Sequence, residues 1–211
     1  GFAIASDVRA ERYQVSVGGG SSYLPSKSMD SLTASTAYAR VDLEAGLTVL
    51  HVPILGHTEV ALNWGSGAVS GSSFGRIESD LSLNTVMALA RVRRPVYRRV
   101  SGFGEFGLGV QWGHLTLDDA SSNSARSLED WDKAAVSSIG AGLDVQLTKS
   151  RGPFNLGIRT KLSYRAMTSL EFNATPMSEG SDELLLSTTS ASLGSVNTSG
   201  MAFAIGLVGH F

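Results

Sequence analysis

The chain has 211 residues, which is enough for one domain or two small ones with a sizeable enclosed core. Charged residues make up 17%, below the roughly 25% usual for soluble domains, and the net charge of -2 gives no electrostatic case for nucleic-acid binding. The absence of Cys excludes disulfides and Cys-ligated metals, and no stretch approaches the ~20 apolar residues of a membrane-spanning helix.

Apolar and polar residues alternate along eight segments of the chain. Between Ala39 and Val49 the odd positions are apolar, whereas the even positions include Arg40, Asp42 and Glu44. Successive side chains of a strand point to opposite faces, so this segment has one apolar and one charged face. No long segment shows helical spacing. The sequence therefore predicts an all-β chain with strands at Arg12–Leu24, Ala39–Val49, Glu59–Trp64, Asp80–Leu89, Glu105–Trp112, Ala141–Leu147, Phe154–Arg165 and Met201–Phe211.

Short and long connectors alternate between these segments. Pro or Gly marks the short ones, and Ser, Gly, Asp and Asn enrich the long ones. In an up-and-down meander, all short turns then lie at one end together with both termini. The short connectors are Pro53–His57, Arg93–Pro95 and Lys149–Pro153, and the long ones are Pro25–Ser35, Gly65–Glu78, Thr116–Lys133 and Asn173–Ser199.

The last segment ends in an aromatic residue on its apolar face, a face formed by Met201, Phe203, Ile205, Leu207 and Phe211. With the alternating connectors, this strand resembles the small eight-stranded outer-membrane β-barrel family of the OmpA transmembrane domain, OmpX and OmpW types. The resemblance covers about Arg12 to Phe211, with Gly209 as a departure. It implies a closed antiparallel up-and-down transmembrane β-barrel with short periplasmic turns and long extracellular loops.

The same resemblance implies that the barrel-insertion machinery recognises the terminal strand through Phe203, Ile205, Leu207 and Phe211. Residues 1–11 are expected to be an N-terminal extension, in which Ala3-Ile4-Ala5 is similar to the end of a signal peptide, and residues 12–211 the barrel domain. No peptidoglycan-binding domain is expected after Phe211.

A soluble lipocalin-like barrel is the alternative, with its apolar face inward. The small residues and isolated charges of the polar faces suit the narrow interior of an eight-stranded membrane barrel better. In the fourth segment, Leu81, Leu83 and Met87 are assigned to the apolar outer face. An interfacial girdle is expected at strand ends from Tyr13, Trp64, Trp112, Tyr164 and Phe211.

The inner faces bring together nine charged residues: Arg40, Asp42, Glu44, Glu59, Glu105, Asp144, Arg159, Lys161 and Arg165. Unpaired buried charges are costly, so four acids are expected to pair with bases. The acids are Glu44, Glu59, Glu105 and Asp144, and the bases Arg40, Arg159, Lys161 and Arg165. The network is interpreted as a plug that fixes register, or as a path for ions and small solutes. An OmpW-like route for apolar molecules along Val86, Ala88 and Ala90 is a third hypothesis.

One short group of polar residues is compatible with catalysis. Some small outer-membrane barrels modify lipid A, and His114, Asp118 and Ser121 offer a base, a carboxylate and a nucleophile near the rim. No longer motif supports this, so a non-enzyme is favoured. His51 and His57 lack a third ligand, so no metal or other cofactor is expected. Arg91, Arg93, Arg94, Arg98 and Arg99 surround one short turn and face lipid phosphates, a periplasmic partner or solvent.

The sequence therefore predicts a multi-pass protein of the bacterial outer membrane with a structural or small-solute permeability role. Expected partners are outer-membrane lipids and lipopolysaccharide, the barrel-insertion machinery, and an extracellular or envelope protein, with no nucleic acid. A lipid A-modifying enzyme with a rim site near His114 is the alternative function.

Overall fold

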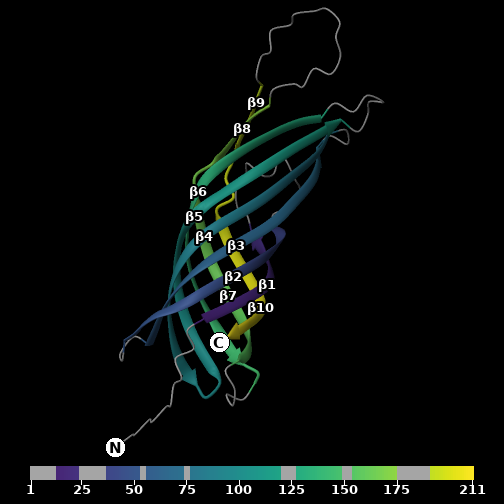
Figure 1. Cartoon of the computed structure of the whole chain (residues 1–211). Helices are drawn as coiled ribbons and strands as arrows, with labels where there is room; N and C mark the ends of the chain where they lie inside the picture. The colour runs from purple at the N-terminus through teal and green to yellow at the C-terminus, as the bar shows by residue number, and fades with distance from the viewer. Residues whose placement is uncertain are drawn as a thin grey trace, which may run out of the picture.

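The computed structural model describes residues 13–23, 37–52, 56–73, 77–119, 127–148, 154–174 and 191–211. Eight of the ten strands form a closed barrel with the order β1-β10-β7-β6-β5-β4-β3-β2, and every neighbouring pair is antiparallel (Figure 1). The barrel strands are β1 (Tyr13–Tyr23), β2 (Ala37–Val52), β3 (Gly56–Ser73), β4 (Ile77–Tyr97), β5 (Val100–Asp119), β6 (Ser127–Gln146), β7 (Asn155–Met167) and β10 (Gly200–His210). The predicted fold class, a closed eight-stranded antiparallel barrel, is confirmed.

The first and last strands close the barrel. β1 pairs with β10 from Gln14–His210 to Tyr23–Met201, and the Phe211 N–H donates to the Tyr13 carbonyl at 2.9 Å. Closure pairs each strand of the barrel wall with a neighbour on both sides, which a bilayer requires of any β-structure that spans it. No helix in the described ranges is long and apolar enough to cross a membrane.

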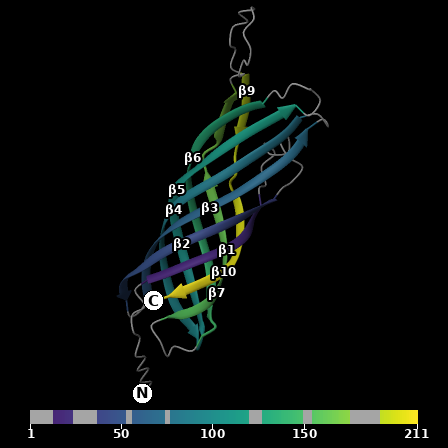
Figure 2. The same cartoon turned by 45° about the vertical axis from the view of Figure 1, so that its right-hand side comes forward.

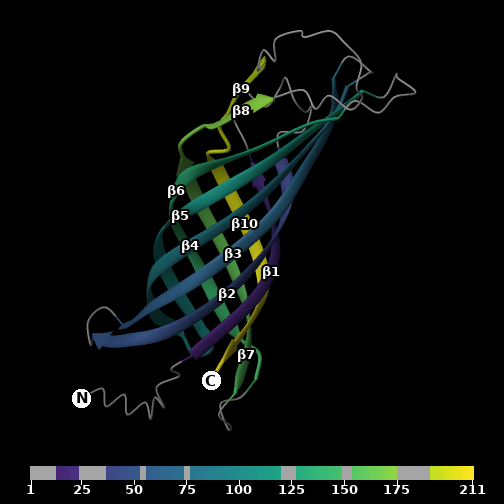
Figure 3. The same ribbon diagram turned by 45° about the horizontal axis from the view of Figure 1, so that its top comes forward.

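Four strands run far beyond a membrane span. β3 to β6 have 18, 21, 20 and 20 residues, whereas roughly 9–11 residues of a tilted strand cross a bilayer. Figure 3 shows these strands extending past the shorter β1 and β2 at the end opposite the C-terminus. The barrel therefore carries a sheet that projects from one side of its rim.

This projection corrects the predicted connector lengths. Most of the predicted loop Gly65–Glu78 is strand, and only residues 74–76 separate β3 from β4. The predicted loop Thr116–Lys133 likewise contains the ends of β5 and β6. Gly and Ser favour turns when read locally, but here the strands pair in continuous register from Trp64–Val86 to Ser73–Ile77. Strict alternation of long and short connectors was therefore wrong.

The turn between β4 and β5 also differs from the prediction. Arg93, Arg94 and Pro95 belong to β4, and the chain reverses at Arg98 and Arg99. A register shift follows Pro95, consistent with its missing N–H donor. This extension of β4 places Arg91 and Arg93 inside the barrel, where both side chains are buried.

The outer face of the barrel is apolar, and the half of the interior nearer the C-terminus is charged. Aliphatic and aromatic side chains such as Leu62, Leu108 and Ile139 are exposed, whereas Glu59, Arg91 and Asp144 are at most 2% exposed. A soluble protein would bury the first set and solvate the second. The arrangement is inverted in the way that a hydrocarbon surrounding requires.

β4 is the one strand whose faces were predicted the wrong way round. Leu81, Leu83 and Met87 are at most 3% exposed and point inward, whereas Val86 and Ala88 are exposed on the outer surface. In the projecting part of β4 the polar Asp80, Ser82 and Asn84 face outward, and below it both faces are apolar, so alternation separated the two faces without showing which one looks inward. The predicted inner route along Val86, Ala88 and Ala90 was therefore wrong, because these side chains lie outside.

The aromatic girdle is confined more narrowly than predicted. Tyr13 and Phe211 are exposed at strand ends, and Phe211 packs on Phe154 with ring centroids 5.1 Å apart. Trp64 lies in the middle of β3 and Trp112 well inside β5, because those strands continue far beyond the predicted ends.

A small second sheet stands at the far end of the barrel. β8 (Leu170–Ala174) and β9 (Ala191–Val196) follow β7 and precede β10, and they pair with each other but not with the barrel (Figures 1 and 2). Both views place them opposite Phe211. The predicted loop Asn173–Ser199 thus contains β9, while residues 175–190 lie outside the described residues, as do residues 1–12.

Candidate functional site

Arg91 is the centre of a charge network inside the barrel. Its Nη1 and Nη2 donate to the two carboxylate oxygens of Glu44 at 2.7 and 2.9 Å, and Nη2 donates to Glu105 at 2.6 Å. Glu59 lies 3.6 Å from Nη1. One guanidinium on β4 therefore neutralises carboxylates from β2, β3 and β5, in the bidentate geometry that makes such pairs strong.

Arg159 joins the opposite wall to the same network. It contacts Asp144 on β6 through two hydrogen bonds of 2.7 Å, Glu44 at 2.6 Å and the side-chain carbonyl of Gln14 at 2.9 Å. Glu44 thus lies between two arginines from β4 and β7. Because the partners come from strands up to 145 residues apart, their pairing depends on the closed barrel and its register.

The remaining pairs lie above and below this centre. Arg93 reaches Glu59 at 2.8 Å and contacts the His210 ring near the C-terminus. Lys161 reaches Glu105 at 3.1 Å. Arg40 pairs with Asp42 on its own strand, and Arg165 lies 3.9 Å from the same carboxylate.

The structure buries all nine sequence-selected charged residues. Arg159 and Lys161 pair with acids of the expected set, whereas Arg40 and Arg165 do not. Arg40 and Arg165 were expected to serve Glu44, Glu59, Glu105 or Asp144, but their partner is Asp42. Arg91 pairs with Glu44 and Glu105 instead, and Arg93 pairs with Glu59. These two arginines were assigned to a turn. They share the odd-numbered parity of Leu83 and Met87, so a strand extended through both arginines would have shown that this face, predicted to be outer, is the inner one.

An aromatic ring completes the charged half. The Arg91 and Arg159 guanidinium carbons lie 4.7 and 5.1 Å from the centroid of Phe103, which is buried on β5. The ring face attracts both cations and excludes water from them. Five buried carboxylates thus face six buried cationic side chains among the described residues.

A short polar relay separates the charged half of the interior from the mouth, which is the end of the barrel opposite the C-terminus. Thr85 donates to the Gln111 side-chain oxygen at 3.0 Å, and the Gln111 amide donates to Thr198 at 2.9 Å. Thr198 lies between β9 and β10, so this relay ties the far bend of the chain to the walls of β4 and β5.

The mouth itself is filled by apolar side chains. Leu81, Leu83 and Leu115 line the inner wall, and Leu170 and Phe172 of β8 cover them with at most 1% exposure. The space for β8 exists because position 113 is Gly, where a Cβ would lie 3.0 Å from Leu170 and 3.2 Å from Phe172. The described interior is therefore closed by an apolar cluster at the mouth.

Carboxylates of the projecting sheet hold β8 in place. The Glu171 and Asn173 N–H groups donate to Asp132 and Asp130 of β6, each at 2.6 Å. Satisfying these backbone donors stabilises a strand that has no barrel neighbour. β8 and β9 thus act as a cover for the mouth, bound to its inner wall by both apolar and polar contacts.

The interior has little free volume. A cavity of about 30 Å³ lies beside Asp42, Glu44 and Arg159, which is room for about one water molecule. Eight strands enclose a space that side chains can fill, and these side chains fill it. Passage of a solute would require the ion pairs to separate and the β8 cover to move.

The residues of the catalytic alternative are not brought together. His114 lies on the outer face, stacked on Trp131 with centroids 4.0 Å apart and 3.6 Å from Glu129. Asp118 is four residues further along β5, roughly 13 Å away for an extended strand. Ser121 lies outside the described residues, as does the side chain of His51. Among the described residues no three His, Cys, Asp or Glu side chains are grouped to hold a metal ion.

A closed eight-stranded barrel with an apolar outer face and an ion-paired interior defines the class of transmembrane β-barrels. No family model matches the chain, and no curated protein matches it. Solved structures do. Neisserial surface protein A aligns with a TM-score of 0.54 and 10% identity, over 95% of this chain and 97% of that one. Ail, the attachment invasion locus protein of Yersinia pestis, solved with the heparin analogue sucrose octasulfate, aligns with a TM-score of 0.50 and 14% identity, over 94% and 97%. At these identities the likeness shows the fold.

Proposed function

We propose that this protein is a structural barrel of the bacterial outer membrane that presents a projecting sheet and its connectors outside the cell. The observation that carries the proposal is the inversion of the barrel, with exposed aliphatic rows outside and buried ion pairs inside. The short β4–β5 turn would face the periplasm, together with the C-terminus, and β8 and β9 the exterior.

The closed interior favours the structural role over small-solute permeability. The Arg91 and Arg159 contacts hold carboxylates of four strands together, and β8 covers the mouth. Moving either charge out of its pairs would leave buried carboxylates without partners, at a cost of several kcal/mol. Reconstituted into planar bilayers, the protein is therefore expected to give no discrete conductance. Regular channel openings that Arg159→Gln changes would instead support the permeability role.

The projecting sheet suits a partner that is not a polyanion. Exposed acidic side chains of its described part include Glu78, Asp80 and Glu129, with Glu171 on the cover. Ail was solved with a sulfated ligand, whereas the like charge here would repel one. We propose an envelope or extracellular protein with basic or neutral contacts as the partner. Lipopolysaccharide would surround the barrel, and the exposed Phe203, Ile205, Leu207 and Phe211 would serve the insertion machinery.

Membrane fractionation combined with heat-modifiable gel migration tests the proposal. The protein, expressed in a bacterium with two membranes, is expected in the outer-membrane fraction, migrating as a compact species until boiled. Recovery as a soluble species without detergent would contradict it. Replacing Phe211 by Ser is expected to lower the yield of folded barrel, whereas the matched change at the exposed Phe106 of β5 leaves it near the wild-type level.

A further inference from the structure

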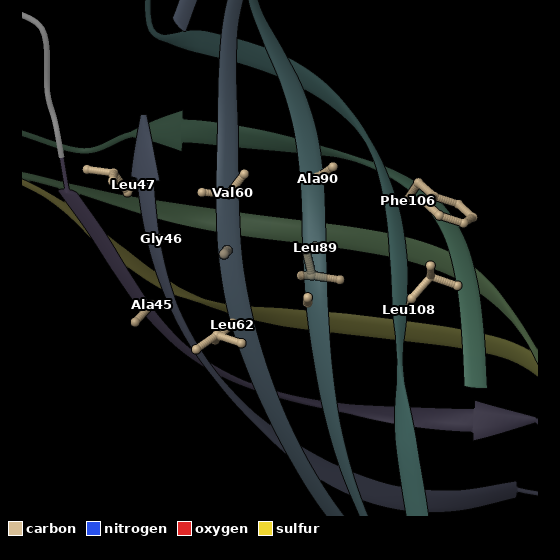
Figure 4. Close-up of a pocket in the computed structure, with 11 residues that line it drawn as sticks. Ala45, Gly46, Leu47, Val60, Leu62, Leu89, Ala90, Phe106 and Leu108 are labelled. Carbon is tan, nitrogen blue, oxygen red and sulfur yellow. The ribbon is translucent and has the colours of Figure 1, made fainter. Parts of the chain in front are cut away.

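The outer surface of the barrel is hollowed along β4. The depression has a volume of about 680 Å³, within the range of roughly 300–1,000 Å³ that ligand sites occupy. Its floor is made by Ala88 and Ala90, the outward-facing residues of β4 (Figure 4). Larger residues of the two neighbouring strands form the walls: Val60 and Leu62 of β3, and Phe106 and Leu108 of β5.

The depression spans β2 to β5, since Ala45 and Leu47 of β2 also line it, and small side chains make a furrow in it along β4. Ala88 is paired with Leu62 on one side and Leu108 on the other, and Ala90 with Val60 and Phe106. Two small side chains in series, each between two large ones, make a channel as long as the strand segment that carries them. An extended hydrocarbon chain fits such a shape, and every lining residue is apolar or Gly.

The lining of the channel ends at Ala90 on β4, and the outer surface of the barrel continues from there towards the turn end. The next outward positions on β4 are Val92 and Arg94, and their partners on β5 are Gly104 and Gly102. A Cβ built on Gly104 would meet no atom closer than 4.0 Å, so the surface there is bare. Arg94 lies four residues beyond Ala90, roughly 13 Å along the strand.

Three exposed cations lie beyond the channel, at the β4–β5 turn. The sequence grouped Arg91, Arg93, Arg94, Arg98 and Arg99 at this turn; the structure buries Arg91 and Arg93 and leaves the other three exposed. Exposed Val96 and Tyr97 lie between them, and the Arg98 guanidinium is 5.7 Å from the Tyr97 ring centroid. Basic groups beside apolar and aromatic anchors match the headgroup level of a bilayer.

We propose that this channel and the cluster Arg94, Arg98 and Arg99 form a binding site for one anionic phospholipid of the periplasmic leaflet. One acyl chain lies over Ala88 and Ala90 between Leu62 and Leu108, and the phosphate meets the arginines. The inference rests on the proposed orientation in the outer membrane and goes beyond it, because any transmembrane barrel contacts lipid, whereas this depression would hold one particular chain.

Native mass spectrometry of the detergent-extracted barrel tests the site with two probes, dipalmitoyl phosphatidylglycerol and dipalmitoyl phosphatidylethanolamine. The wild type is expected to bind the anionic lipid at least about tenfold more tightly, as several basic residues near one charged headgroup would give. The triple variant R94Q/R98Q/R99Q should lose this preference. Filling the channel with Ala88→Leu and Ala90→Leu should lower the binding of both lipids about tenfold.

Matched controls separate the site from general lipid coverage. Ala166→Leu enlarges an exposed alanine on β7, and Lys133→Gln removes an exposed cation at the other end of the barrel. Neither should change lipid binding. Equal binding of the two lipids by the wild type, or equal losses in the controls, would overturn the site. So would a dimer mass that Ala90→Leu abolishes, since a second copy would then fill the channel. In each of these cases heat-modifiable migration would still report the closed barrel, so the proposed function stands or falls separately.

Discussion

The two halves of the barrel interior are closed by different means. Towards the short turns, buried arginines and carboxylates from six strands satisfy one another, with Arg91 and Arg159 at the centre. Towards the opposite mouth, Leu83, Leu115 and Phe172 pack without hydrogen bonds. Ion pairs need defined geometry, so the first half specifies which strands are neighbours and in which register. Apolar packing has no such direction, so the second half seals the mouth without specifying register.

Removing Arg91 should have the largest effect of all. Arg91→Ala leaves Glu44, Glu59 and Glu105 short of a partner in a closed interior. The free energy of unfolding is expected to fall by about 3–5 kcal/mol. Urea titration of the folded, heat-modifiable band in lipid–detergent micelles measures it. Lys133→Ala, which removes an exposed cation of β6, is the control, with a change within about 0.5 kcal/mol. Similar losses in both variants would contradict the central role of Arg91.

Displacing the cover should have a smaller and more local effect. Gly113→Val puts a side chain where Leu170 and Phe172 now lie, so β8 must move. We expect a loss of about 1–3 kcal/mol, with faster hydrogen exchange at the Glu171 and Asn173 N–H groups. Gly104→Val, which meets open space on the outer face, is the control. Unchanged exchange in β8 would show that the cover does not depend on this contact.

Cutting the relay between the halves should have the smallest effect. Thr85→Val keeps the side-chain shape but removes the donor to Gln111. A loss of about 1 kcal/mol is expected, because Gln111 keeps its second partner, Thr198. Thr160→Val, on the outward-facing side of β7, should change stability by less than about 0.5 kcal/mol. A Thr85 effect as large as that of Arg91 would mean that the relay, too, specifies the register.

The alternation of side chains predicted the barrel but not all of its details. Seven of the strands have one clearly apolar face, so their outer sides followed directly from the sequence. β4 is apolar on both faces only from Val86 to Ala90, and the parity shared by Met87, Arg91 and Arg93 distinguishes its inner side. The chosen turn at Arg93–Pro95 ended the strand before that parity was used.

The contacts that hold β8 over the mouth could not be predicted from local sequence patterns. β8 is held by Asp130 and Asp132, about 40 residues earlier in the chain, and by the missing side chain at Gly113. Such contacts exist only in the folded chain, since nothing in a five-residue strand names its distant partner. The pairing inside the barrel is similar: the inner face of every strand but β4 was predicted, whereas the choice of Asp42 by Arg165, on another strand, depends on register.

The direction in which the aliphatic rows face is the claim on which the rest depends, and a single labelling experiment measures it. The chain has no Cys, so Leu62→Cys and Asn63→Cys each carry one spin label on adjacent, oppositely directed positions of β3. In lipid vesicles, the label at position 62 should be mobile, relaxed strongly by oxygen and little by a water-soluble nickel complex. The label at position 63 should be immobile and reached by neither. Strong relaxation by the nickel complex at position 62 would mean that this face meets water, which contradicts the account.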